Sequence, residues 1–201
     1  MTTGFELLLA PPRLWSRDEV LSTACVPRSG GVYAWYFRDS PQLVPLAGCI
    51  VRGDFALLYA GIAPKAPPKA GRPSSQTLFH RIRYHMQGNA EGSTLRLTLG
   101  CLLGLELRRI GSGERRTFAD QERQLSDWLD RNARVCWMET SEPWLVEKEL
   151  IRSACLPLNL DQNRAHPFHA VLSEIRRTSK RRADDRPVWM LNQLDSTRSL
   201  S

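Results

Sequence analysis

The chain has 201 residues, a length that fits one domain with elaborations or at most two small units. Hydrophobic residues make up 42% of it and the mean hydropathy is −0.36, so a sizeable core can form and a largely disordered chain is excluded. The longest apolar-rich stretch, 94–107, is too short to cross a bilayer and contains Arg96 and Glu106. The N-terminal stretch lacks the basic region of a secretion signal. We therefore expect a cytoplasmic protein with no membrane partner.

The charge balance is basic, with a net charge of +7 and a sequence pI near 9.5. Lysine and arginine side chains gain free energy by releasing condensed counterions from nucleic acid, so this balance favours a polyanionic partner. Many basic proteins bind no nucleic acid, however. The charge alone therefore indicates a class of partner without deciding it.

The cysteines are dispersed along the chain, odd in number and free of any CxxC pair. This distribution argues against a disulfide framework and favours buried free thiols in a reducing compartment. The five residues are Cys25, Cys49, Cys101, Cys136 and Cys155.

The first strands of the predicted sheet lie in the N-terminal third of the chain. Ser16 has the position of a helix cap. The stretch 31–37 predicts a strand whose alternate side chains face opposite sides. The connection 38–54 contains prolines and glycines and leaves room for one short strand. A second strand is expected over 56–60, stopping at Gly61.

A proline-rich tract and a helix follow the second strand. The tract 63–75 cannot form regular structure, because proline removes donors and fixes φ. A helix is expected to begin near Ser74 or Ser75. On this helix Arg81 and His85 are four residues apart, which places them on one stripe.

The middle of the chain is less regular. The stretch 93–107 fits a helix throughout, or a helix followed by a strand. Basic residues and glycines at 108–116 predict a turn or the tip of a hairpin. A further helix is expected over 118–131 and a third strand over 134–138.

The C-terminal third is expected to be helical. Ser141 followed by Pro143 predicts a helix start, and that helix should run to about Cys155. Another helix, roughly 167–179, leads into a basic tail whose charges lie at 176–186. Two interpretations of this tail stay open: a disordered solvated end, or a segment that contacts phosphate.

Together these elements predict an α+β domain, a small sheet with helices packed against it. Residues 1–28 would form an N-terminal extension, 29–170 the main domain, and 171–201 a C-terminal helix and basic tail. Within the main domain the connection at 38–54 and the insertion at 91–132, between the helix of Arg81 and the third strand, are long. Such insertions usually carry substrate recognition.

Four short segments, far apart in the chain, carry the residue types that phosphodiester hydrolysis needs. Two phenols can handle or orient a proton, a guanidinium can neutralise charge on a phosphate, and a carboxylate can hold a divalent metal. The segments are the triplet GVY at 31–33, the triplet YAG at 59–61, the pair Arg81 and His85, and the pair Glu147 and Asn159.

In this order and spacing the four segments resemble the GIY-YIG nuclease superfamily, in particular its stand-alone bacterial-type endonucleases. In that family two strands of a small antiparallel sheet of about three core strands carry the naming triplets. One helix then carries the arginine, and a later helix carries a metal-binding glutamate. The resemblance spans roughly 30–168. Val32 and Ala60 replace the middle isoleucines of the triplets, and the 26-residue spacing of the tyrosines is like that of some restriction endonucleases of the family.

The resemblance implies a metal-dependent DNA endonuclease. Glu147 would hold one Mg²⁺ or Mn²⁺, Arg81 would bind the scissile phosphate, and Tyr33 would activate the attacking water. A phenol with an ordinary pKa near 10 is a poor base at neutral pH, so Arg81, the metal or His85 must assist it. The site residues that the resemblance implies are Tyr33, Tyr59, Arg81, His85, Glu147 and Asn159.

Alternatives stay open on the sequence alone. Each segment also has an ordinary structural interpretation, such as a tyrosine in a strand or a solvated helix face, and only the joint order favours a site. Because Ala60 departs from the family pattern, a catalytically inactive nucleic-acid-binding module of the same fold remains an alternative. Lys65 is left outside the predicted site, because Ile62 occupies the position where the family usually has lysine or serine. DNA, duplex or branched, is the expected substrate, but the sequence does not decide between duplex, branched or single-stranded DNA and RNA, nor between a role in restriction and one in repair. Double-strand cleavage would need a homodimer or sequential nicking.

Overall fold

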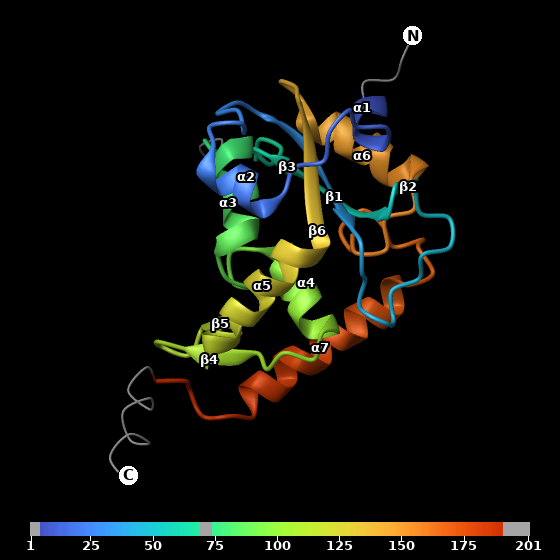
Figure 1. The fold of residues 1–201 in the computed structure, drawn as a ribbon. Coiled ribbons are helices and arrows are strands. Elements are labelled where there is room, and N and C mark those ends of the chain that lie inside the picture. The colour runs from blue at the N-terminus through green and yellow to red at the C-terminus, as the bar shows by residue number, and fades with distance from the viewer. Residues whose placement is uncertain (1–4, 69–73, 191–201) are drawn as a thin grey trace.

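The strand predicted at 31–37 is the centre of the sheet. The computed structural model, which describes residues 5–68 and 74–190, pairs this strand antiparallel with a neighbour on each side (Figure 1). The strand order is β2-β3-β1-β6. This confirms the predicted α+β class with an antiparallel sheet, and the short strand allowed within 38–54 is β2. The strands are β1 (Gly31–Phe37), β2 (Val51–Arg52), β3 (Phe55–Ala63) and β6 (Ala133–Glu139).

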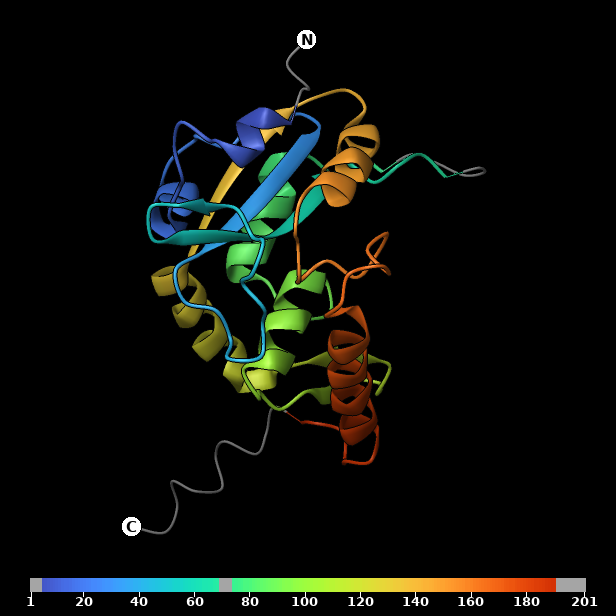
Figure 2. The ribbon, with the colours of Figure 1, turned by 90° about the vertical axis from the view of Figure 1, so that its right-hand side faces the viewer.

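Helices cover both faces of the sheet, as Figures 1 and 2 show. The odd-numbered side chains of β1 from Tyr33 to Phe37 pack into a core shared with α2, α3, α4 and α5. The even-numbered ones from Val32 to Tyr36 pack toward α1 and α6. No helix in the described ranges is long and apolar enough to cross a membrane. The helices are α1 (Glu6–Leu9), α2 (Arg17–Ser22), α3 (Leu78–Gln87), α4 (Thr94–Leu102), α5 (Glu122–Asn132), α6 (Pro143–Ser153) and α7 (His169–Asp184).

Two of the predicted helix starts need correction. Ser16 caps α2 as expected, in a capping box. Helix α3 begins at Leu78 rather than near 74–75: Thr77 is extended, and the first N–H groups of the helix, those of Leu78 and Phe79, donate to carbonyl oxygens of the segment before β1. Helix α6 has Glu142 at its N-cap and Pro143 in the first turn, so proline's fixed φ rather than a hydroxyl of Ser141 marks its start.

Two elements are longer than the sequence predicts. Strand β3 continues past Gly61 to Ala63, because 61–63 pair with the first residues of β1. Helix α7 runs to Asp184 and includes most of the basic stretch expected to be a tail. The helix persists because its apolar stripe is buried, with Leu172 and Ala183 inaccessible to solvent against α4 and β4. Residues 191–201 of the predicted tail, like 69–73 of the proline-rich tract, lie outside the described residues.

The 91–132 insertion packs beside α3. The stretch 93–107 forms α4 and then a non-helical segment, and a hairpin of β4 (Arg108–Ile110) and β5 (Arg115–Thr117) follows, as expected near 108–116. Arg96 is completely buried and forms a 2.6 Å ion pair with Glu122. It also donates to the carbonyl oxygens of His85 and Met86 at the end of α3. The insertion is therefore fixed to the helix that carries Arg81 and His85.

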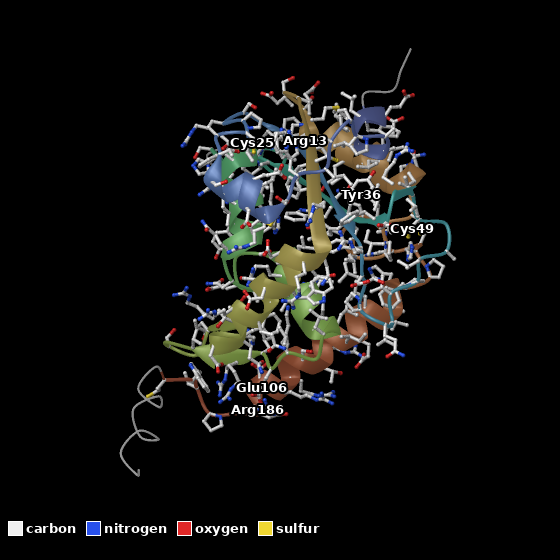
Figure 3. All side chains as sticks on the ribbon, in the orientation of Figure 1. Arg13, Cys25, Tyr36, Cys49, Glu106 and Arg186 are labelled. Atoms are coloured by element: carbon white, nitrogen blue, oxygen red, sulfur yellow. The ribbon has the colours of Figure 1, made fainter. Side chains whose placement is uncertain are left out.

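The segment after α7 is held to the rest of the chain by an ion pair. Arg186, just beyond α7, forms an ion pair with Glu106, and Figure 3 shows the two side by side.

All five cysteines are free, as predicted, but only Cys101 and Cys136 are buried. The burial prediction is wrong for the other three, which are only partly buried: they lie in segments between helices and strands, and Cys25 and Cys49 pack against the outside of the core.

Candidate active site

The glycines of both triplets allow close approaches that a larger residue would block. A Cβ atom at Gly31 would lie 2.2 Å from the carbonyl oxygen of Met138. Gly61 lies opposite Tyr33 on the neighbouring strand, and a Cβ there would lie 2.5 Å from the Tyr33 hydroxyl oxygen. The Tyr33 ring therefore lies directly over Gly61 and occupies the space that a side chain there would need.

Replacing Gly61 with alanine is expected to displace the Tyr33 ring. The extra methyl group should cost about 1–3 kcal/mol of unfolding free energy, because a packed interior does not absorb the added volume. If Tyr33 acts on substrate, cleavage should fall by about 100-fold, since misplacing a reacting group by about 1 Å has that effect. Thermal melting and plasmid cleavage by Gly61→Ala check this. A folded variant that cleaves like wild type would show that the position of Tyr33 over Gly61 does not matter.

A chain of buried hydrogen bonds runs behind Tyr33. Its hydroxyl lies 2.8 Å from Nε2 of His85, and Nδ1 of His85 lies 2.7 Å from the Oγ of Ser93. The Ser93 oxygen also accepts the backbone N–H of Arg96, at 3.0 Å. The ring of His85 is completely buried among the rings of Tyr33, Trp35 and Tyr59.

Burial and neighbouring cations set the charge state of this pair. The pKa of His85 is lowered well below its usual value by burial and by the charges of Arg81 and Arg96, so the ring is neutral at pH 7. Burial raises the pKa of Tyr33 to about 12, although the nearby Arg81 guanidinium acts in the opposite direction. Burial also raises the pKa of Tyr59. At rest both phenols are therefore protonated, and His85 is uncharged.

Arg81 lies one turn before His85 on α3, as its spacing in the sequence predicts. Its side chain is half-buried, lines a cleft beside Tyr33, and donates to the carbonyl oxygen of Gly92 at 2.6 Å. A guanidinium has five N–H donors, so this one bond leaves others for an anion in the cleft.

The cleft gathers side chains from both faces of the sheet. It has a volume of about 610 Å³ and lies where β3 extends past the end of its pairing with β2. Tyr33, Tyr59 and Arg81 reach it from the face covered by α3, and Glu147 reaches it from α6 on the other face. Asn159 lines it from the segment after α6. Five of the six predicted site residues thus line one cleft, and His85 lies behind Tyr33 without lining it.

Asn159 completes the open edge of β3. Its Nδ2 donates to the carbonyl oxygen of Ala60 and its Oδ1 accepts the N–H of Ala60, both at 2.9 Å. The backbone N–H of Leu158 donates to the carbonyl oxygen of Leu58 at 3.0 Å. The side chain therefore takes the place of a neighbouring strand and satisfies two buried backbone groups. Because these bonds involve only the backbone of Ala60, they do not depend on which side chain occupies that position.

Glu147 is the carboxylate that could hold a metal. It is partly buried, and its Oε2 accepts a hydrogen bond from Nε2 of Gln162 at 3.2 Å. Burial raises its pKa to about 7; the charge of Asp161 also raises it, while the Gln162 bond and the charge of Lys65 lower it. No cluster of three or more histidine, cysteine or acidic side chains in the described ranges could hold a metal ion. One carboxylate in an open polar cleft still fits Mg²⁺, which keeps several waters and binds substrate phosphate through one or two carboxylates.

Further side chains line the cleft that the sequence pattern did not indicate, among them Lys65, Trp144, Asp161 and Gln162. Asp161 and Gln162 follow Asn159 directly, so the segment after the asparagine was the available signal. Lys65, which the sequence analysis left out, also lines the cleft, as does Trp144 at the start of α6. The proline-rich tract gave no periodicity from which the position of Lys65 followed.

An antiparallel sheet with phenols, a guanidinium and a carboxylate around one cleft has the parts of a catalytic domain for phosphoryl chemistry. A family model described as the GIY-YIG catalytic domain matches residues 31–178. This match covers most of the chain, so the chain belongs to the GIY-YIG family, as its resemblance indicated, and its domain is a nuclease domain that implies a nucleic-acid substrate. No curated protein and no solved structure matches the chain.

Proposed function

We propose that the protein is a metal-dependent DNA endonuclease whose active site is the cleft beside β3. The observation that carries this proposal is the convergence of Tyr33, Arg81 and Glu147 on one cleft from opposite faces of the sheet. Residues so far apart in sequence meet there only through the fold. The hydrogen bond from Tyr33 to a buried neutral histidine adds a path for a proton.

Tyr33 would orient and deprotonate the attacking water. In the proposed arrangement the Tyr33 O–H donates to Nε2 of His85, and the N–H of Nδ1 donates to the Ser93 oxygen. A lone pair of the Tyr33 oxygen then faces the cleft and accepts a proton from water. Because the pKa of Tyr33 is about 12 and that of His85 is far lower, the phenol proton moves only as the water attacks phosphorus.

The other side chains would bind and position the substrate. Arg81 would donate to non-bridging phosphate oxygens and offset the charge that grows in the transition state. Tyr59 would position water or phosphate from the same face. Asn159 would hold the edge of β3, and with it Gly61, in place.

Glu147 would hold the single divalent metal, Mg²⁺ or Mn²⁺. Such an ion, when bound, stabilises charge on the leaving oxygen and on the phosphate. Gln162 fixes one carboxylate oxygen of Glu147 by a hydrogen bond, and Asp161 adds negative charge nearby. Both features favour a cation at this position.

Supercoiled plasmid, incubated with and without Mg²⁺, tests the proposed function. Conversion to nicked, linear or fragmented DNA only with the metal is the expected result. Sharp fragments would support a restriction enzyme and point to paired sites in a homodimer, whereas nicks alone would support a repair-type enzyme. Retention of DNA at low salt without cleavage in Mg²⁺ or Mn²⁺ would contradict the proposal and favour the inactive binding module.

A further inference from the structure

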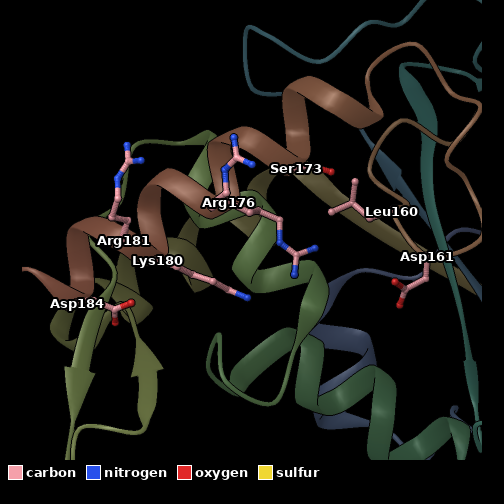
Figure 4. A pocket seen from close by; sticks show the side chains of 8 residues that line it. Leu160, Asp161, Ser173, Arg176, Lys180, Arg181 and Asp184 are labelled. Atoms are coloured by element: carbon pink, nitrogen blue, oxygen red, sulfur yellow. The ribbon is translucent and has the colours of Figure 1, made fainter.

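A basic groove lies along α7, outside the cleft. It has a volume of about 530 Å³ and lies between α7 and the segment at Leu160–Asp161 (Figure 4). Four cationic side chains line it from one side of the helix. They are Arg176, Arg177, Lys180 and Arg181, and we call this hollow the α7 groove.

Most of this positive charge is not neutralised by the residues that the structure describes. Arg177 pairs with Glu174, and Asp184 at the far end pairs with Arg116. Arg176, Lys180 and Arg181 form no ion pair with any residue in the described ranges. Arg176 is also partly buried, and this burial lowers its pKa. A guanidinium kept partly from water without a paired carboxylate gains free energy when an anion binds beside it.

The α7 groove continues from the proposed active site. Leu160 and Asp161 line both the groove and the cleft, so the two hollows meet at this segment. From Arg176 to Arg181 the helix rises by about 7.5 Å. Along one strand of duplex DNA that distance holds about two phosphates. The free cations of the groove therefore match a short run of backbone phosphates next to the phosphate in the cleft.

The rest of the basic stretch faces elsewhere. Arg182 and Arg186 line a different hollow together with Glu106, to which Arg186 is paired. The charge at 176–186 is thus divided between two sides of the chain, and only one side adjoins the cleft.

We propose that the α7 groove binds the phosphate backbone of the nucleic-acid strand that flanks the scissile phosphate, an inference that rests on the proposed nuclease function. Arg176, Lys180 and Arg181 supply the contacts. Because they reach phosphates and not base edges, the groove adds affinity and fixes the direction of the strand without reading sequence. It thereby extends the substrate-binding surface from the cleft along α7.

A matched pair of double variants tests this proposal. Lys180→Gln/Arg181→Gln removes two exposed cations of the groove, and Arg123→Gln/Arg131→Gln removes two exposed cations of α5. Helix α4 lies between α5 and α7, so the control changes the net charge equally but far from the groove (Figure 2). Binding to a fluorescent duplex of about 30 base pairs, longer than two helical turns, is measured in EDTA between about 50 and 200 mM salt.

The groove variant should bind at least about tenfold more weakly than wild type near 200 mM salt, and its salt slope should be smaller by about 1.8, the value for two lost phosphate contacts. The α5 variant should bind like wild type, and both should melt like wild type because all four side chains are exposed. If wild type cleaves plasmid but duplex binding is weakened equally in both variants, or in neither, the proposed role of the α7 groove is wrong and the nuclease function stands. Binding that depends on the groove, without cleavage by wild type in Mg²⁺ or Mn²⁺, overturns the nuclease function and supports the groove.

Discussion

Tyr33→Phe is expected to reduce DNA cleavage by a factor of about 10² to 10⁴, the usual contribution of a group that transfers a proton in the transition state. The variant keeps the aromatic ring above Gly61 and loses only the hydroxyl. Binding of DNA in EDTA should change little, because Arg81 and the basic surfaces remain. The unfolding free energy should fall by about 1–3 kcal/mol, since Nε2 of buried His85 loses its partner.

Tyr36→Phe is the matched control for this change. Tyr36 lies on the same strand but faces the opposite side of the sheet, where its buried hydroxyl donates to the carbonyl oxygen of Leu8 at 2.8 Å. Its loss should lower stability by a similar amount, because one buried acceptor again loses a donor. Cleavage, measured at a temperature where both variants are folded, should stay near the wild-type rate. An equal loss of cleavage in the two variants would mean that Tyr33 has only a structural role.

Some elements of the fold could be predicted from the sequence because neighbouring residues determine them. Strand β1 follows from a short run of apolar and aromatic residues whose side chains point alternately to the two faces of the sheet, and both faces are buried. Arg81 and His85 share one side of α3 because four residues make just over one helical turn. Ser16 caps α2 through contacts within four residues. Each of these predictions needs only the neighbouring sequence.

The errors arise where distant contacts decide the outcome. Strand β3 passes Gly61 because β1 supplies pairing partners for 61–63, which no local pattern reveals. Charges at the end of α7 indicate a solvated tail, yet burial of Ala183 keeps that segment helical. Lys65 reaches the cleft only through tertiary packing. The meeting of Tyr33 and Glu147 was itself predictable only through the family resemblance.

Glu147→Gln is expected to abolish metal-dependent cleavage, a loss of at least about 10²-fold, because a neutral amide is a poor ligand for a hard cation. DNA binding in EDTA should persist or tighten, since one carboxylate leaves a cleft that receives phosphate. The matched control is Glu149→Gln, which changes an exposed carboxylate two residues further along α6 and should cleave normally. Cleavage by Glu147→Gln at the wild-type rate would exclude Glu147 as the metal-binding carboxylate.

The same pair of variants also separates the metal site from the fold. Glu147 has a pKa of about 7 in the folded protein, above its ordinary value of 4.5, so the folded state retains a proton that the unfolded chain has lost between these pH values. Wild-type stability in EDTA should therefore fall as the pH rises from about 4.5 to about 7 and stay reduced above it. Glu147→Gln has no charge to bury, so at pH 8 it should be more stable than wild type by about 1–3 kcal/mol, and at pH 4 it should be equal.

Adding Mg²⁺ at pH 8 should raise the melting temperature of wild type and of Glu149→Gln but not that of Glu147→Gln, because binding to the folded state alone stabilises it. The melting temperatures of the three proteins could instead shift together, both with pH and with Mg²⁺. That result would show that burial does not raise the pKa of Glu147 and that Glu147 does not bind the ion.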